Sequence, residues 1–160
     1  MLPMSECTYR LRSAQPGDAL RIHDLHTASV RALCSTHYAQ DVIDGWLVNR
    51  SPQGYMPGIE HGRTFVAEDG DTLIGFGEAG PGVVIGIFVG PHAVARGVGT
   101  KLAQHAFHLA RRNHTGPIRL ESTLNAVSFY RRFGFREKER TAVRRNFVEV
   151  PIVVMELNND

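Results

Sequence analysis

The sequence predicts one α/β domain of the α+β type, in which helices flank a mixed, mostly antiparallel sheet. Short apolar runs of strand length alternate with segments in which apolar residues recur every three or four positions. The 160 residues are enough for one domain with a substantial core, and they contain no linker, repeat or low-complexity tract. We therefore expect residues 1–160 to form a single domain with about seven strands and about four helices.

The elements follow from these patterns in chain order. Strands are expected at residues 8–13, 64–68, 72–78, 83–89, 118–123, 135–142 and 146–157. Helices are expected at residues 16–33, 40–49, 97–112 and 125–133. Asp69-Gly70-Asp71 predicts a tight turn between two of the strands, and the Gly- and Pro-rich residues 51–62 predict a loop.

The region around residues 83–109 carries the strongest functional signal. The apolar run 83–89 stops at Gly90-Pro91, and Gly97 and Gly99 then open a helix whose apolar residues share one face. A helix start presents unpaired N–H groups and the positive end of the helix dipole, which suit a phosphate. Glycine lets the phosphate approach the backbone. The pattern predicts a phosphorylated cofactor, although the turn alone is equally compatible with a glycine-capped helix that binds nothing.

Two familiar phosphate motifs do not fit this turn. The third glycine of a dinucleotide fingerprint is replaced by Leu102. A P-loop would need a further glycine upstream of Gly99-Thr100-Lys101, and none lies at the right distance.

A second segment, residues 119–135, reads as a strand and a short helix that ends at Gly134. Together with the turn it resembles the GNAT superfamily of acyl-CoA-dependent N-acyltransferases. The pyrophosphate motif of that superfamily, Gln/Arg-x-x-Gly-x-Gly/Ala, corresponds to residues 94–99, with Val94 at the position of the usual Gln or Arg. The later motif A-x-x-x-Y-x-x-x-G-F is matched by Ala126, Tyr130, Gly134 and Phe135. The opening residues 11–19 are also similar, so the resemblance spans most of the chain.

The resemblance implies transfer of an acetyl group from acetyl-CoA, as cosubstrate, to a primary amine. It implies that two strands separate beside residues 83–89 and admit the pantetheine arm. A backbone N–H of Phe88 or Val89 would polarise the thioester carbonyl, and Tyr130 would be the general acid. The family often has Asn where this chain has Thr123, and Asn125 lies two residues later. The expected acetyl-CoA contacts are therefore Phe88, Val89, Val94, Ala95, Arg96, Gly97, Val98, Gly99, Thr100 and Asn125.

The general base is less clear from the sequence. Many relatives place a Glu where this chain has Val83. If Gly80-Pro81 forms the tip of a hairpin, Glu78 lies opposite Val83 and could fill that role, although it could equally be a solvated strand-end residue. His37 is the other candidate, since histidine titrates in a useful range.

The connection between the first two helices lines the acceptor cleft in GNAT folds, which makes Cys34, His37 and Tyr38 candidate substrate contacts. A Cys34–His37 nucleophile pair is discounted because no third group orients it. Trp46 is expected in the core, and no Cys/His spacing predicts a metal site.

Composition excludes several classes of function. A net charge of +2 without a basic stripe does not predict a nucleic-acid partner. No apolar run approaches the roughly 20 residues of a membrane span, and the N-terminus does not read as a signal peptide. Cys7 and Cys34 form no disulfide framework, so we expect a cytoplasmic protein.

Two further interpretations remain open beside an active acetyltransferase. One is a non-catalytic acyl-CoA-binding or sensory domain, and the other is a domain that serves only protein interaction. An exposed closing strand at residues 147–155 could pair between subunits to form a homodimer. The acceptor amine, whether peptide N-terminus, lysine, polyamine, amino acid or drug, is not predicted.

Overall fold

A seven-stranded sheet of order β1-β2-β3-β4-β5-β7-β6 organises residues 9–158, the part of the chain that this computed structural model describes. Thr8 and Cys7 lie outside the described residues. The strands are β1 (Arg10–Ser13), β2 (Thr64–Asp69), β3 (Thr72–Gly80), β4 (Val83–Val89), β5 (Ile118–Thr123), β6 (Arg136–Arg145) and β7 (Val148–Leu157). All neighbouring strands are antiparallel except β4 and β5, which are parallel. The predicted fold class is confirmed.

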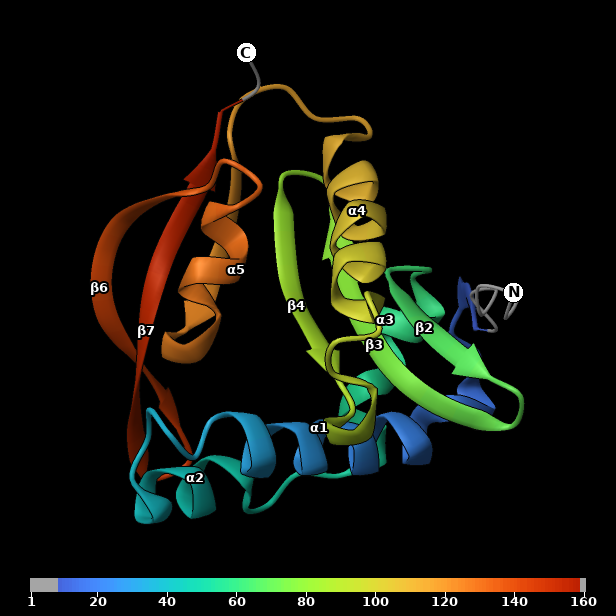
Figure 1. Ribbon diagram of the computed structural model, residues 1–160, viewed down its shortest axis with the longest axis horizontal. Helices are drawn as coiled ribbons and strands as arrows, with labels where there is room; N and C mark the ends of the chain where they lie inside the picture. The colour runs from blue at the N-terminus through green and yellow to red at the C-terminus, as the bar shows by residue number, and fades with distance from the viewer. Residues whose placement is uncertain (1–8, 159–160) are drawn as a thin grey trace, which may run out of the picture.

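The helices cover both faces of the sheet (Figure 1). They are α1 (Ala19–Leu33), α2 (Gln40–Leu47), α3 (Met56–Glu60), α4 (Val98–Arg111) and α5 (Val127–Arg131). Phe65 and Ala67 on β2 belong to the core shared with α4 and α5, whereas the intervening Val66 belongs to the core under α1 and α3. This alternation is the period of two that a strand buried on both faces requires.

Close packing of α4 on the sheet depends on glycine. A Cβ at Gly75 would lie 2.7 Å from the Leu102 side chain, and a Cβ at Gly77 would lie 2.5 Å from the ring of Phe65. Both distances are shorter than any real carbon–carbon contact, so these two positions of β3 must lack a side chain. The N-terminus of α4 is thereby held against β3 and β4.

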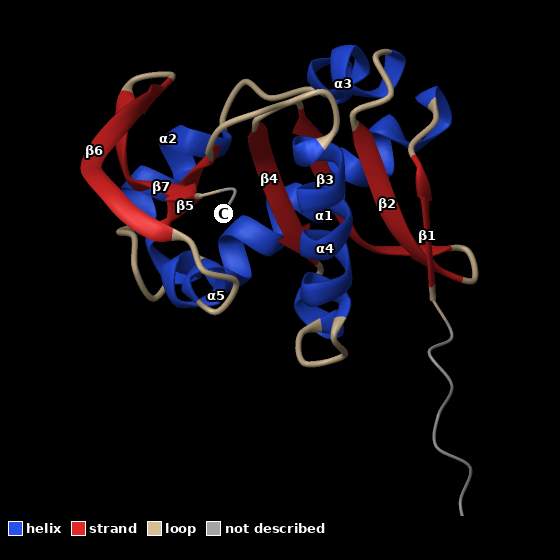
Figure 2. Cartoon of the chain, turned by 90° about the horizontal axis from the view of Figure 1, so that it is seen from above, coloured by secondary structure: helices blue, strands red, loops and turns tan. Residues whose placement is uncertain are grey.

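The sheet divides between β4 and β5. These strands share only two pairs, Val83 with Arg119 and Val84 with Leu120, after which they diverge. Figure 2 shows the two parts from above, with β1 to β4 on one side and β5, β7 and β6 on the other. The predicted separation of strands is therefore present, and it leaves Ile85 55% exposed in the middle of the sheet.

Three expectations about the fold need correction. Most of residues 51–62 is helical, as the 3₁₀ helix η2 (Pro52–Tyr55) followed by α3. Pro52 and Pro57 occupy first-turn positions, where proline favours a helix rather than a loop. Strand β7 lies between β5 and β6, so it has no free edge with which to pair with another subunit.

The third correction concerns the β3–β4 hairpin. It turns through Pro81 and Gly82, with Gly80 opposite Val83. The turn lies one residue later than predicted, which alone moves the partner of Glu78 from Val83 to Ile85, and a bulge between Glu78 and Ala79 moves it one residue further, to Gly86. The position of the turn and the extra residue together break the predicted pairing.

Candidate functional site

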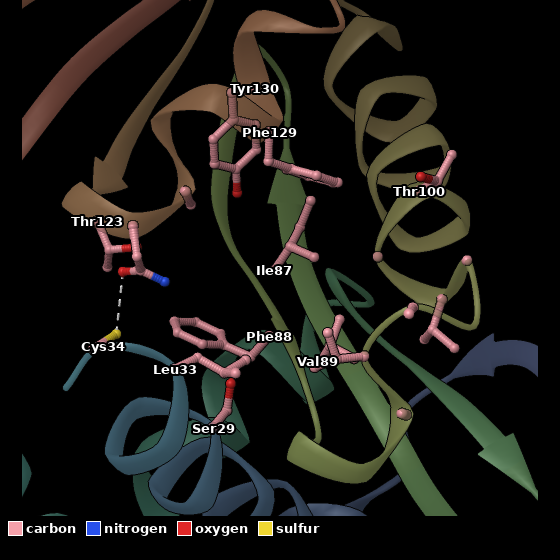
Figure 3. A pocket seen from close by; sticks show the side chains of 18 of the residues that line it. Ser29, Leu33, Cys34, Ile87, Phe88, Val89, Thr100, Thr123, Phe129 and Tyr130 are labelled. Carbon is pink, nitrogen blue, oxygen red and sulfur yellow. Dashed lines mark hydrogen bonds between the residues drawn. The ribbon is translucent and has the colours of Figure 1, made fainter. Parts of the chain in front are cut away.

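The separation of β4 from β5 opens a cleft of about 650 Å³. Its walls come from the C-terminal end of α1, the last residues of β4, the turn before α4, the end of β5 and the short helix α5 (Figure 3). Nine of the ten predicted cosubstrate contacts line it: Phe88, Val89, Val94, Ala95, Gly97, Val98, Gly99, Thr100 and Asn125. Segments that are distant in the sequence thus meet where the sheet divides.

Arg96 is the exception among the predicted contacts. Its guanidinium forms an ion pair with Asp69 at 3.0 Å and lies over the ring of Tyr9, and it lines a different cavity. Its backbone N–H donates to the carbonyl of Ala93 at 3.3 Å. Its side chain is therefore directed elsewhere, and its N–H is already bonded.

The turn before α4 presents free backbone donors to the cleft. Lys101 is the first residue of α4 whose N–H bonds back along the chain, to Gly97 at 3.2 Å. The N–H groups of Val98, Gly99 and Thr100 precede it, and a helix start gives them no intrahelical acceptor. Gly97 adopts φ 78° and Ala95 adopts φ 73°. The second value is costly for a residue with a side chain, by about 1 kcal/mol, and such strain is typical of binding loops.

Strand β4 contributes one further donor. The N–H of Gly90 bonds to the carbonyl of Ile74 on β3 at 2.8 Å. Because successive N–H groups of a strand point to opposite edges, the N–H of Val89 points to the edge that β5 has left. Of the two predicted residues, Val89 therefore directs its N–H into the cleft, and Phe88 lines it with its ring.

Tyr130 lies on α5 with its hydroxyl directed into the cleft (Figure 3). Its ring packs edge-on against Phe129 and Phe135, and only 5% of the residue is exposed. Burial raises the pKa of the phenol well above its usual value of 10. The hydroxyl therefore keeps its proton at neutral pH.

Cys34 has a structural role at the cleft wall. The thiol of Cys34 donates to Oδ1 of Asn125 at 3.4 Å, and burial raises its pKa to about 11, so it is not a thiolate nucleophile. Because this bond occupies Oδ1, the amide nitrogen of Asn125 is left as the donor for the cleft.

Tyr38 does not line the cleft, contrary to the prediction. Its hydroxyl donates to the carbonyl of Pro151 at 2.5 Å and accepts from the N–H of Leu124 at 3.0 Å. Trp46 packs edge-on against it in the core. Tyr38 is therefore a clamp that fixes the α1–α2 connection to β7 and to the segment that carries Asn125.

The two candidate bases lie in different places. His37 is exposed on the cleft wall, where Nδ1 lies 2.9 Å from the Thr36 hydroxyl. Glu78 is half-buried away from the cleft, against α3: a Cβ at Gly58 would meet both its carboxyl and the Thr64 hydroxyl within 3 Å. Desolvation raises the pKa of Glu78, and the charge of Arg63 opposes that rise.

Sequence reasoning missed several wall residues, among them Ser29, Leu33, Ile87, Phe129 and Arg132. Arg132 carries the most information, because its guanidinium lies 5.4 Å from the ring centroid of Phe129 at the cleft. In the sequence, Arg131-Arg132 resembles an ordinary solvated pair. Only its position three residues after Phe129 on a short helix could have signalled that contact.

Two further features were sought among the described residues, a metal-binding group and a membrane-spanning helix. Between residues 9 and 158 no group of three or more His, Cys, Asp or Glu side chains is arranged to hold a metal ion. Within the same range, no helix combines the length and apolarity needed to cross a membrane.

Comparison with known proteins identifies relatives of this arrangement. The family model described as "Acetyltransferase (GNAT) domain" matches residues 34–157. A GCN5-related N-acetyltransferase of Rhodopseudomonas palustris has the same fold, with a TM-score of 0.87 at 24% identity over 97% of this chain and 98% of its own. The PaiA N-acetyltransferase of Thermoplasma acidophilum, solved with coenzyme A, gives a TM-score of 0.74 at 19% identity over 94% of this chain and 98% of its own.

A curated relative, an uncharacterized N-acetyltransferase of Methanocaldococcus jannaschii, is 26% identical over 141 residues. The match covers 82% of this chain and 62% of the length of that relative.

The raised pKa of Glu78 predicts a stability effect that depends on pH. Above the usual value of 4.5 the unfolded chain ionises freely, whereas the folded protein pays desolvation for the charge, so this group favours folding less as pH rises. Glu78→Gln is therefore expected to raise the melting temperature at pH 7 and to give no gain below pH 4.5, as measured by calorimetry. Glu139→Gln on the exposed face of β6 controls for the lost charge. A lower melting temperature for Glu78→Gln at pH 7 would mean that the attraction to Arg63 dominates.

Proposed function

This chain belongs to the GNAT family of acetyltransferases, and we propose that it transfers the acetyl group of acetyl-CoA to a primary amine by direct attack of the amine on the thioester. The observation that carries the proposal is the convergence of three features on one cleft. These are the free N–H groups at the start of α4, the N–H of Val89 on the open edge of β4, and the hydroxyl of Tyr130.

The turn before α4 has the properties that a pyrophosphate requires. The N–H groups of Val98, Gly99 and Thr100 would donate to its oxygens, and the dipole of α4 adds positive potential. At Gly99 a Cβ would meet Val89 and Phe129 at 3.5 and 3.6 Å, so the hydrogen of glycine keeps the floor of the cleft open. The lack of Gln or Arg at Val94 matters little, since the donors come from the backbone.

Bound acetyl-CoA would supply an activated acetyl group. Val89 would donate its N–H to the thioester oxygen as charge develops there, and this fixed donor costs no reorganisation during the reaction. The Asn125 amide nitrogen would hold the pantetheine arm, because Cys34 already occupies Oδ1. Tyr130 would donate a hydrogen bond to the sulfur of CoA and would transfer its proton to that sulfur as the carbon–sulfur bond breaks.

His37 is favoured over Glu78 as the group that takes the proton from the amine. A general base must lie within reach of the proton, directly or through one water molecule. His37 is one of the residues that line the cleft, whereas the Glu78 carboxyl is directed toward Gly58 and Thr64. Two alternatives make different predictions. A non-catalytic acyl-CoA-binding domain would bind CoA without turnover, and a pure interaction domain would not bind CoA.

Substitution at Gly99 tests the cosubstrate site. Gly99→Val is expected to weaken acetyl-CoA binding at least about tenfold, which is about 1.4 kcal/mol, because its methyl groups would cover the free N–H groups. Isothermal titration calorimetry with acetyl-CoA measures the effect. Gly17→Ala is the control, since a Cβ there meets nothing within 4 Å. No heat with the unmodified protein would remove the enzyme proposal and favour the interaction domain.

Substitution of the acid and the base tests the chemistry. Tyr130→Phe and His37→Gln are each expected to lower kcat about 10²- to 10⁴-fold while acetyl-CoA binding changes less than about twofold. The measurement is thiol release with a panel of amines, beside calorimetry for binding. A Tyr130→Phe variant of unchanged kcat would exclude it as the acid, and a larger loss for Glu78→Gln than for His37→Gln would assign the base to Glu78.

A further inference from the structure

A second group of polar side chains lies beyond Phe88, outside the lining of the cleft. His26 of α1, Arg50 after α2 and Tyr55 of η2 meet there. Nδ1 of His26 lies 2.8 Å from the hydroxyl of Tyr55, and Nη2 of Arg50 contacts both of these atoms. The guanidinium carbon of Arg50 lies 5.6 Å from the centroid of the Tyr55 ring. We call His26, Arg50 and Tyr55 the basic cluster.

The basic cluster has more hydrogen-bond donors than acceptors. Nη1 of Arg50 and Nε2 of His26 are both buried without a hydrogen-bond partner. Because Nδ1 of His26 accepts from its neighbours, the proton of the neutral ring is on Nε2, which is therefore a donor. Buried polar atoms are nearly always satisfied in folded proteins, so two unpaired donors at one place indicate a missing acceptor.

The basic cluster also lacks a counter-ion. In the described part of the chain, the charged group nearest in effect to Arg50 is Arg145, which repels it, and no carboxylate acts on it. Burial together with Arg145 lowers the pKa of Arg50, and burial lowers that of His26 well below its usual 6.5. A partly buried guanidinium without an anion is costly unless a ligand supplies one.

The basic cluster continues the cleft. The His26 ring centroid lies 3.9 Å from that of Phe88, which lines the cleft. His26 also precedes Ser29 and Leu33 by three and seven positions, on the stripe of α1 that forms the cleft wall. His26, Arg50 and Tyr55 are each partly exposed, but Nη1 of Arg50 and Nε2 of His26 are covered, so a carboxylate would reach these two atoms after a shift of the side chains over them.

We propose that the basic cluster is the acceptor subsite and that it binds a carboxylate, so the acceptor of this enzyme is an amine that also carries a carboxylate group. Nη1 of Arg50 would donate to one carboxylate oxygen and Nε2 of His26 would donate to the other, since these are the two nitrogens left without a partner. This assignment rests on the proposed function, because the amine must reach the thioester held at Val89.

Matched acceptors test the charge preference. The panel pairs α-amino acids and unbranched ω-amino acids of increasing length with their carboxamides, and thiol release from acetyl-CoA reports turnover. The unmodified protein is expected to favour the acids at least about tenfold in kcat/KM, and Arg50→Gln is expected to remove the preference, a change of about 1.4 kcal/mol. Arg50→Lys keeps the charge without the planar fork and should retain part of it. Carboxamides that react as well as the acids, or a preference that survives in Arg50→Gln, would overturn the proposal.

A binding measurement separates this proposal from the proposed function. Sodium acetate serves as the carboxylate probe, with sodium chloride at equal ionic strength as the reference, and ¹H–¹⁵N spectra follow the His26 ring. Saturable shifts in the unmodified protein and in Arg140→Gln, an exposed arginine on β6, but not in Arg50→Gln, are expected. The same result in all three proteins, or no shift, contradicts the subsite even when acetyl-CoA binds. If acetyl-CoA does not bind but acetate does, only the acetyltransferase proposal fails.

Discussion

The separation of β4 from β5 after two residue pairs is the constraint on which the rest of the site depends. In an intact sheet the N–H of Val89 would bond to a neighbouring strand and would not be available to a ligand. The separation also gives the turn before α4 and the Tyr130 hydroxyl access to the same cleft. The interruption is tolerated because the core under α4 and α5 continues across both parts of the sheet, from Phe65 on β2 to Leu120 on β5 and Met155 on β7.

Two kinds of contact hold the open cleft in place. On one side, Gly75 allows α4 to lie close to β3, which fixes the direction of its first N–H groups. On the other side, Tyr38 and Cys34 bind the end of α1 to the segment 124–126. These contacts span 86 and 91 positions in the sequence, so the two walls are cross-linked by side chains rather than by strand pairing. A cleft built in this way needs little rearrangement to admit a ligand.

Local motifs predicted the parts of the site that lie on continuous segments. The turn at residues 94–99 and the position of Tyr130 follow from spacing within a few residues, and both line the cleft. The choice of Val89 over Phe88 needed the register of β3 and β4, which a hydrogen bond from Gly90 reveals. Glu78 was misplaced because the turn lies one residue later than Gly80-Pro81 suggests and because a bulge adds a further shift, and neither is visible in the pattern of apolar residues. The order of β7 and β6 was missed because strand order is not encoded locally.

Contacts between distant residues could not be predicted. The partner of the Tyr38 hydroxyl is a carbonyl 113 positions away, so its role could not be distinguished from that of a pocket residue. His26 and Arg50 lie 24 positions apart and match no motif, yet they meet in the folded chain, and each carries a buried side-chain nitrogen without a hydrogen-bond partner. Chemistry that depends on such a meeting of segments becomes visible only in the folded chain.

The central claim is that the gap between β4 and β5 receives the acyl-bearing arm of the cosubstrate. A crystal structure of this protein with acetyl-CoA tests it most directly. We expect the thioester oxygen within hydrogen-bond distance of the Val89 N–H, about 2.9 Å, with the pyrophosphate on the N–H groups of residues 98–100. A complex in which acetyl-CoA binds elsewhere, or in which β4 and β5 pair along their full length, would contradict this account.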